Sequence, residues 1–224
     1  MQRISCVIFD LDGTLSQTNE LIFATFNYVA EKYLGKRLSP PEITALFGPP
    51  EEIAIERLVG KEQSAPAMDD FYSFYEHHHP LMASAYDGIR EMLDFLKQRG
   101  LILAIFTGKG RRTALITLEQ IGIRNHFDLI VTGTDVTSHK PSPEGICNVM
   151  EKFGLDASQV LMVGDSVSDI RAARGAGVRI ASVVWDSYGR DKVMQMDVDY
   201  RFYSVVEFVS WLKKNISGNG AAIS

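Results

Sequence analysis

Clusters of polar side chains follow apolar runs at four places in this chain, and their residue types suit phosphate chemistry. Four of the side chains are carboxylates, whose concentrated negative charge requires a cation. Oxygen-only ligands favour a hard ion, and Mg²⁺ is the usual one beside phosphate. A lysine and a threonine would supply a positive charge and a hydroxyl donor for phosphoryl oxygens. The side chains are Asp10, Asp12 and Thr14, then Thr107, then Lys140, and finally Asp165 and Asp169.

The apolar run before each cluster predicts a short strand that is buried on both faces, as in a parallel sheet. From residue 88 onward, strands and helices alternate, which favours such a sheet with helices on both faces. Ligands bind at the carboxyl ends of strands in this architecture, so all four clusters should meet at one edge. The expected strands are 4–9, 101–106, 127–131, 160–163 and 178–184, and the expected helices are 89–98, 112–121, 143–153, 167–174 and 203–213.

The segment 16–83 breaks this alternation, because its periodicity is helical throughout, over 19–34, 40–47, 51–59 and 68–83. The sequence Ser39-Pro-Pro-Glu42 predicts a capping box at the start of the second of these helices. We therefore predict an α/β fold, a Rossmann-like parallel sheet with a small all-helical cap domain inserted after the first strand. The expected boundaries are 1–15 and 84–224 for the α/β core and 16–83 for the cap.

Composition narrows the function classes. The 224 residues carry a net charge of −5 without a basic run, so neither nucleic acid nor an anionic membrane is an expected partner. No apolar stretch approaches the ~20 residues that span a bilayer. The two cysteines, Cys6 and Cys147, fit reduced structural residues. The expectation is a cytoplasmic protein whose partner is a small molecule. The tail 217–224 is expected to be frayed.

The four motifs together resemble those of the haloacid dehalogenase superfamily of hydrolases, over nearly the whole chain. They are Asp10-Leu-Asp-Gly-Thr14, Thr107, Lys140 and Gly164-Asp-Ser-Val-Ser-Asp169. An acid at position 12 is typical of the phosphate-transferring members rather than of the dehalogenases. The resemblance therefore implies a Mg²⁺-dependent phosphatase that acts on a small phosphate ester.

The resemblance also implies a role for each matching residue. Asp10 is expected to attack phosphorus, forming an aspartyl-phosphate, and Asp12 to act as general acid and then general base. Thr107 and the backbone N–H of Gly108 should hold phosphoryl oxygens, and Lys140 should neutralise Asp10. The expected Mg²⁺ ligands are Asp10, the backbone carbonyl of Asp12 and Asp165, with Asp169 orienting the metal or its waters.

The inserted helices are similar to the cap of phosphoglycolate phosphatase-like members, in which the cap closes over the site and helps to select the substrate. Gly48-Pro-Pro50 matches a cap loop near the active site. His77-His-His79 is not expected to bind metal, because adjacent histidines on a helix point in different directions. A partly exposed cap surface is the expected place for it.

Several functions remain open at the level of the sequence. The substrate of the phosphatase could be phosphoglycolate-like or a sugar phosphate. The alternatives are a phosphomutase of the β-phosphoglucomutase type, a pyrophosphatase and a binding protein that has lost turnover. A dinucleotide-binding domain is disfavoured, because acids follow the first strand where pyrophosphate needs glycines. The oligomeric expectation is a monomer or a homodimer.

Overall fold

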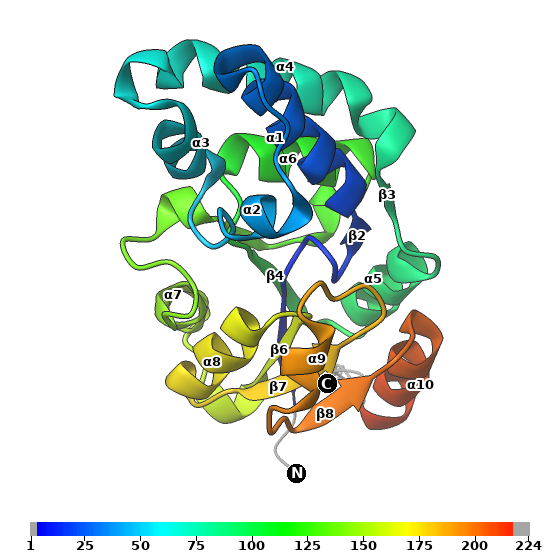
Figure 1. The fold of residues 1–224 in the computed structure, drawn as a ribbon. Coiled ribbons are helices and arrows are strands. Elements are labelled where there is room, and N and C mark those ends of the chain that lie inside the picture. Colours follow the sequence, from blue (N-terminus) through cyan, green and yellow to red (C-terminus); the bar gives the residue numbers. More distant parts are fainter. Residues whose placement is uncertain (1–3, 217–224) are drawn as a thin grey trace.

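A parallel sheet of six strands forms the centre of the protein (Figure 1). The computed structural model describes residues 4–216, so the expected tail at 217–224 lies outside the described residues. The strand order is β5-β4-β1-β6-β7-β8, and every neighbouring pair is parallel. The strands are β1 (Cys6–Phe9), β4 (Ile102–Phe106), β5 (Leu129–Val131), β6 (Val160–Gly164), β7 (Arg179–Val183) and β8 (Tyr200–Phe202).

Alternate residues of the strands pack against helices on opposite faces of the sheet. Val7 and Phe9 of β1 belong to one apolar cluster, with residues of α5, α6 and α10. Cys6 and Ile8 belong to a second cluster, with residues of α7, α8 and α9. Burial on both faces explains why these strands are nearly continuous apolar runs. The helices are α5 (Ile89–Gln98), α6 (Arg111–Gln120), α7 (Glu144–Phe153), α8 (Val167–Ala176), α9 (Arg190–Met194) and α10 (Val205–Asn215).

Four helices between residues 17 and 84 pack on one another through a third apolar cluster, which includes Phe26, Ile55 and Phe71. Figure 1 places them together beyond one end of the sheet. The capping box predicted at Ser39 is present, since Glu42 Oε2 accepts the backbone N–H of Ser39 at 2.8 Å. The helices are α1 (Asn19–Leu34), α2 (Pro40–Thr44), α3 (Glu51–Val59) and α4 (Lys61–Met82).

A two-stranded antiparallel ribbon joins these helices to the sheet. Its strands, β2 (Ser16–Gln17) and β3 (Ser84–Ala85), pair where the chain leaves the sheet and where it returns. The predicted fold class, a parallel sheet covered on both faces with an inserted helical cap, is therefore confirmed. We propose 16–83 as the cap and the flanking segments as the core, since the ribbon closes the insertion at these points.

Some elements differ from the expectation. Helix α4 begins at Lys61 instead of Met68, because it continues through Pro66, which costs one intrahelical hydrogen bond without ending the helix. Helix α2 ends at Thr44, before the expected Phe47. The short elements β2, β3, α9 and β8 have no counterpart in the sequence prediction. No helix within residues 4–216 is long and apolar enough to cross a membrane.

Candidate active site

One cavity of about 210 Å³ lies at the carboxyl ends of the central strands, between the sheet and the cap. Asp10 follows β1, Thr107 follows β4 and Asp165 follows β6, and all three line it. Parallel pairing of β1 with β4 and β6 brings these positions together, although they are far apart in sequence. The cavity lining also contains Asp12, Gly108 and Lys140.

Lys140 joins two of the carboxylates. Its Nζ lies 3.1 Å from Oδ1 of Asp10 and 2.6 Å from Oδ1 of Asp169. Its side chain is 4 % exposed and passes over the ring of Phe106, 4.8 Å from the centroid. Burial alone would lower the pKa of Lys140, but the two carboxylates raise it above the usual value. Lys140 is therefore a fixed positive charge next to Asp10.

Asp169 is fully buried in the first turn of α8, where it forms a capping box with Ser166. Its Oδ2 accepts hydrogen bonds from Ser166 N at 3.0 Å and Ser166 Oγ at 2.6 Å, while its Oδ1 binds Lys140. Gly164 at the end of β6 makes room for this carboxyl group. A β-carbon at position 164 would lie 2.4 Å from Cγ of Asp169, so the carboxyl group would have to move.

Replacement of Gly164 by alanine is therefore expected to displace Asp169 and, through it, Lys140. We predict a loss of stability of about 1–3 kcal/mol from overpacking. Displacement of the groups around Asp10 should also lower kcat/KM roughly a hundredfold. Val163→Ala is the matched control, since it empties the neighbouring core position but leaves Asp169 in place. Thermal unfolding and phosphate release are the measurements. Full activity of Gly164→Ala would show that activity does not depend on the position of the Asp169 carboxyl group.

Asp165 is held from three sides. Thr14 Oγ1 donates to its Oδ1 at 3.1 Å, and Ser187 Oγ donates to its backbone carbonyl at 2.6 Å. Gly13, with φ of 74°, turns the chain closely past the carboxylate, and a β-carbon there would lie 2.7 Å from Oδ2 of Asp165. Glycine is the residue that adopts this left-handed conformation without strain, which explains its place in the Asp10-Leu-Asp-Gly-Thr14 motif.

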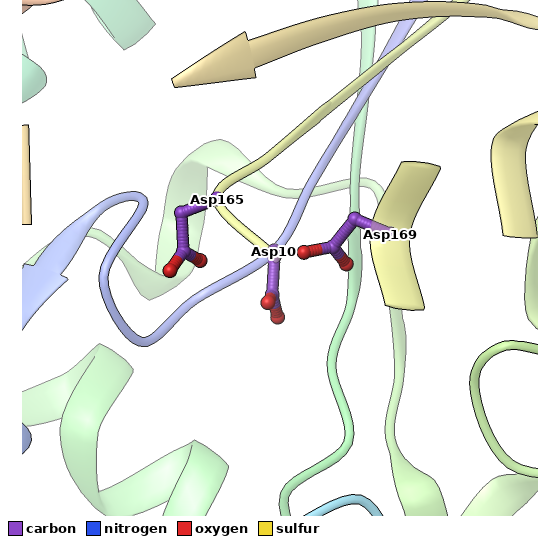
Figure 2. Close-up of side chains that lie close together, drawn as sticks. All are labelled: Asp10, Asp165 and Asp169. Carbon is purple, nitrogen blue, oxygen red and sulfur yellow. The ribbon is translucent and has the colours of Figure 1, made fainter. Parts of the chain in front are cut away.

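Asp10, Asp165 and Asp169 form the carboxylate cluster of the site, and each offers an oxygen within 4.8 Å of the others (Figure 2). Within residues 4–216, hydrogen bonds engage only Oδ1 of Asp10 and of Asp165, whereas both oxygens of Asp169 have partners. Burial and the charge of Asp169 raise the pKa of Asp10 to about 7, and burial with the neighbouring carboxylates also raises the pKa of Asp165. An all-oxygen donor set with excess negative charge fits Mg²⁺.

The side chain of Asp12 contacts Thr18 and Lys109 and does not belong to the carboxylate cluster. Its Oδ1 accepts a hydrogen bond from Thr18 Oγ1 at 2.5 Å, and its Oδ2 lies 3.3 Å from Nζ of Lys109. This carboxylate lines the cavity without joining the cluster of Asp10, Asp165 and Asp169. Both of its oxygens have partners outside that cluster, and Thr18 is a partner that the sequence analysis did not single out.

Lys109 connects the core with the cap. Its Nζ lies 3.3 Å from Asp12 Oδ2 and 3.3 Å from Oε1 of Glu51 in α3, and 4.7 Å from the ring centroid of Tyr75 in α4. Glu51 also accepts hydrogen bonds from Gly110 N and from Thr113 Oγ1 in α6. Burial alone would lower the pKa of Lys109, but Asp12 and Glu51 help to raise it well above its usual value. The sequence gives no signal for this network, because its members are distant along the chain.

The cap loop rests directly on the core. A β-carbon on Gly108 would lie 3.1 Å from the carbonyl oxygen of Gly48, and one on Gly133 would lie 3.0 Å from Pro50. Gly108 therefore contributes backbone and no side chain at the point where the cap meets the site. This contact puts the expected cap loop, 48–50, at the cavity.

The expectation for the histidine triplet is wrong for its last member. His79 is 1 % exposed, and its Nε2 lies 3.2 Å from Oγ1 of Thr117 in α6. Burial lowers the pKa of His79 to about 4, so this ring is neutral at physiological pH. His77 is exposed and His78 half-buried, as expected of a cap surface. His79 faces inward because it lies one helical turn after the buried Tyr75.

Three comparisons agree with this description. The family model for haloacid dehalogenase-like hydrolases matches residues 7–183. The chain is 35% identical to pyrophosphatase PpaX of Halalkalibacterium halodurans, over 92% of this chain and 96% of that one. It is 33% identical to pyrophosphatase PpaX of Bacillus velezensis, over 89% and 92%. The crystal structure of a predicted phosphoglycolate phosphatase from Haemophilus somnus superposes with a TM-score of 0.81 at 25% identity, over 96% of this chain and 99% of that one.

The match of the family model over residues 7–183 makes this chain a hydrolase. The chain belongs to the haloacid dehalogenase-like hydrolase family, and proteins named pyrophosphatase and predicted phosphoglycolate phosphatase are among those it is similar to. The resemblance noted from the four motifs is confirmed.

Proposed function

We propose that this protein is a Mg²⁺-dependent phosphatase that hydrolyses a small phosphorylated metabolite through an aspartyl-phosphate on Asp10. The observation that carries the proposal is the convergence of Asp10, Lys140 and Asp165 on one cavity beneath the cap. A carboxylate nucleophile beside a fixed cation suits phosphoryl transfer, where catalysis consists mainly of positioning and charge stabilisation.

In the first step, a carboxylate oxygen of Asp10 bonds to phosphorus while the bond from phosphorus to the ester oxygen breaks. Asp12 donates its proton to that oxygen, so the leaving group departs as an alcohol. In the second step, Asp12 removes a proton from water, and the resulting hydroxide attacks phosphorus. The bond from phosphorus to Asp10 breaks, phosphate leaves and both carboxyl groups return to their initial states.

The other residues hold the phosphoryl group. Thr107 and the backbone N–H of Gly108 donate to its oxygens, and Lys140 offsets the charge of Asp10 and of the developing transition state. Asp10, Asp165 and the backbone carbonyl of Asp12 are the proposed ligands of Mg²⁺. Asp169 binds Lys140 and so helps to position it beside Asp10. Mg²⁺ would supply positive charge to the phosphoryl oxygens.

The cap suits a small substrate, because the cavity of about 210 Å³ is smaller than the ~300–1,000 Å³ of pockets for drug-sized ligands. A cytoplasmic location and a monomeric or homodimeric state stay predictions from the sequence. Pyrophosphate hydrolysis is a second candidate, favoured by the 35% identity with a relative named pyrophosphatase.

Removal of the metal is the direct test of the proposed chemistry. Phosphate release from phosphoglycolate, sugar phosphates, alkyl phosphates and pyrophosphate should stop when EDTA is added and return with excess Mg²⁺. The expected loss is at least about a hundredfold, because the carboxylate cluster and the phosphoryl group then repel each other without a compensating cation. Circular dichroism in EDTA serves as the control for folding. Undiminished release by the folded, metal-free protein would contradict the proposal.

A further inference from the structure

The wall of the cavity that faces the carboxylates is apolar. It comes from the cap, from α1, from the loop after α2 and from α3. A leaving group attached to a phosphoryl group at Asp10 would lie against this wall, since the core side of the cavity is occupied by the phosphoryl-binding residues. The wall residues are Ile22, Phe26, Leu46, Phe47, Pro49 and Ala54.

The cations at the cavity are already paired. Among the described residues, Lys109 and Lys140 are the two lysines or arginines that line it. Lys140 is shared by Asp10 and Asp169, and Lys109 is shared by Asp12 and Glu51, with all four contacts between 2.6 and 3.3 Å. A second phosphate or a carboxylate on the substrate would therefore compete with carboxylates for each lysine.

The remaining polar groups of the cap side do not suit an anion either. Glu51 is itself negative. The amide nitrogen of Asn19 is directed to Asp186, 3.3 Å from Oδ2 and 3.5 Å from the backbone oxygen. An anion placed against the apolar wall would lose part of its hydration without gaining a free cation, which is unfavourable.

Aromatic rings extend the apolar wall to the edge of the cavity. Tyr188, from the loop between β7 and α9, stacks on Phe23 of α1 with ring centroids 4.9 Å apart. Phe47 packs edge-on against Phe23, with centroids 6.0 Å apart, and is 40 % exposed. The contact of Tyr188 with Phe23 joins core and cap, so the apolar surface is continuous across the closing interface.

We propose that the preferred substrate is a small phosphate monoester whose alcohol has an uncharged, mainly apolar body, and that Phe47 contributes to this selection. The inference rests on the proposed phosphatase function. It separates this chain from enzymes whose leaving group is a second phosphate or carries a carboxylate. It also restricts the alcohol to a few carbon atoms or one ring, because the cavity of about 210 Å³ is small.

A matched set of substrates tests the inference. Propyl phosphate and phosphoglycolate are similar in size and differ by a carboxylate, while benzyl phosphate adds a ring and pyrophosphate a second phosphate. The carboxylate makes glycolate the better leaving group chemically, so a preference for propyl phosphate must come from the protein. We expect kcat/KM for propyl and benzyl phosphate to exceed those for phosphoglycolate and pyrophosphate by about tenfold or more.

A positive charge placed in the wall should weaken the preference for uncharged substrates. Phe47→Arg supplies an unpaired cation at a partly exposed position, so the variant should fold. The ratio of kcat/KM for pyrophosphate to that for benzyl phosphate should rise about tenfold or more. Leu34→Arg is the control, because Leu34 is 39 % exposed on the same cap domain and does not line the cavity. The ratio should not change in this control.

Binding gives a readout that does not depend on turnover. Calorimetry with the Asp10→Asn variant and Mg²⁺ should show tighter binding of benzyl phosphate than of phosphoglycolate or pyrophosphate. If wild type prefers pyrophosphate or phosphoglycolate tenfold, the inference is overturned while the chemistry at Asp10 stands. If no compound is hydrolysed, the proposed function fails, and the calorimetric order still decides the inference, since tighter binding of the charged compounds overturns it.

Discussion

Phosphate release by Asp10→Asn should fall to background, by roughly a thousandfold or more. The amide matches the carboxylate in shape but lacks the negative charge that makes the oxygen a nucleophile. The fold should persist, because Lys140 keeps its contact with Asp169 at 2.6 Å. The measurement combines steady-state phosphate release with acid-quenched reactions of ³²P-labelled substrate, which should label wild type and leave Asp10→Asn unlabelled.

Asp94→Asn is the matched control for this variant, since it removes a carboxylate whose side chain is 54 % exposed and pairs with His126, outside the cavity lining. It should be labelled and should turn over like wild type. Activity of Asp10→Asn within tenfold of wild type, or label that remains on the variant, would remove Asp10 from the proposed role.

Asp12→Asn should separate the two steps of the reaction. With para-nitrophenyl phosphate, the leaving nitrophenolate needs no proton, so the first step should still occur. The second step lacks its base, so one equivalent of nitrophenolate per active site should appear as a burst before slow turnover. With an alkyl ester both steps need Asp12, and turnover should fall about 10²–10⁴-fold.

Rapid mixing with absorbance detection measures the burst, and Asp10→Asn provides the comparison, because it should show none. Alkyl ester turnover by Asp12→Asn within tenfold of wild type would assign the acid–base role to another group. The contacts of Asp12 with Thr18 and Lys109 should survive the substitution in weakened form, since the amide oxygen can accept from Lys109 while the amide NH2 donates to the hydroxyl oxygen of Thr18.

The sheet and the carboxylate site were predictable from the sequence for a physical reason. A strand buried on both faces needs a continuous apolar run, and parallel strands end at a common edge, so a polar residue at the end of each run falls at the site. Asp10 after β1 and Asp165 after β6 follow this rule, and both lie in one cavity. The helix α1 was also predictable with its bounds, because a stripe of apolar residues ends at Gly35.

The contacts between cap and core could not be predicted in this way. Glu51 is the first residue of α3, an ordinary place for an acid because its charge complements the helix dipole, and nothing local in the sequence links it to Lys109. The burial of His79 depends on α4 packing against α6, a tertiary contact without a sequence period of its own. Strand β8 lies at the sheet edge and has only three residues, with Arg201 between Tyr200 and Phe202. It therefore lacks the continuous apolar run that predicts a buried strand.

The ribbon of β2 and β3 would allow evolution to replace the segment inserted between these two strands. Ser16 pairs with Ala85, so the two chain crossings lie side by side, and whatever is inserted between them starts and finishes at neighbouring points. A replacement segment of different length or composition would leave the strands and their carboxylates unstrained, because the entropic cost of closing a loop grows only slowly with its length. We therefore expect the proposed cap, 16–83, to be exchangeable: a cap transplanted from a relative should change substrate preference while the proposed chemistry stays with the recipient core.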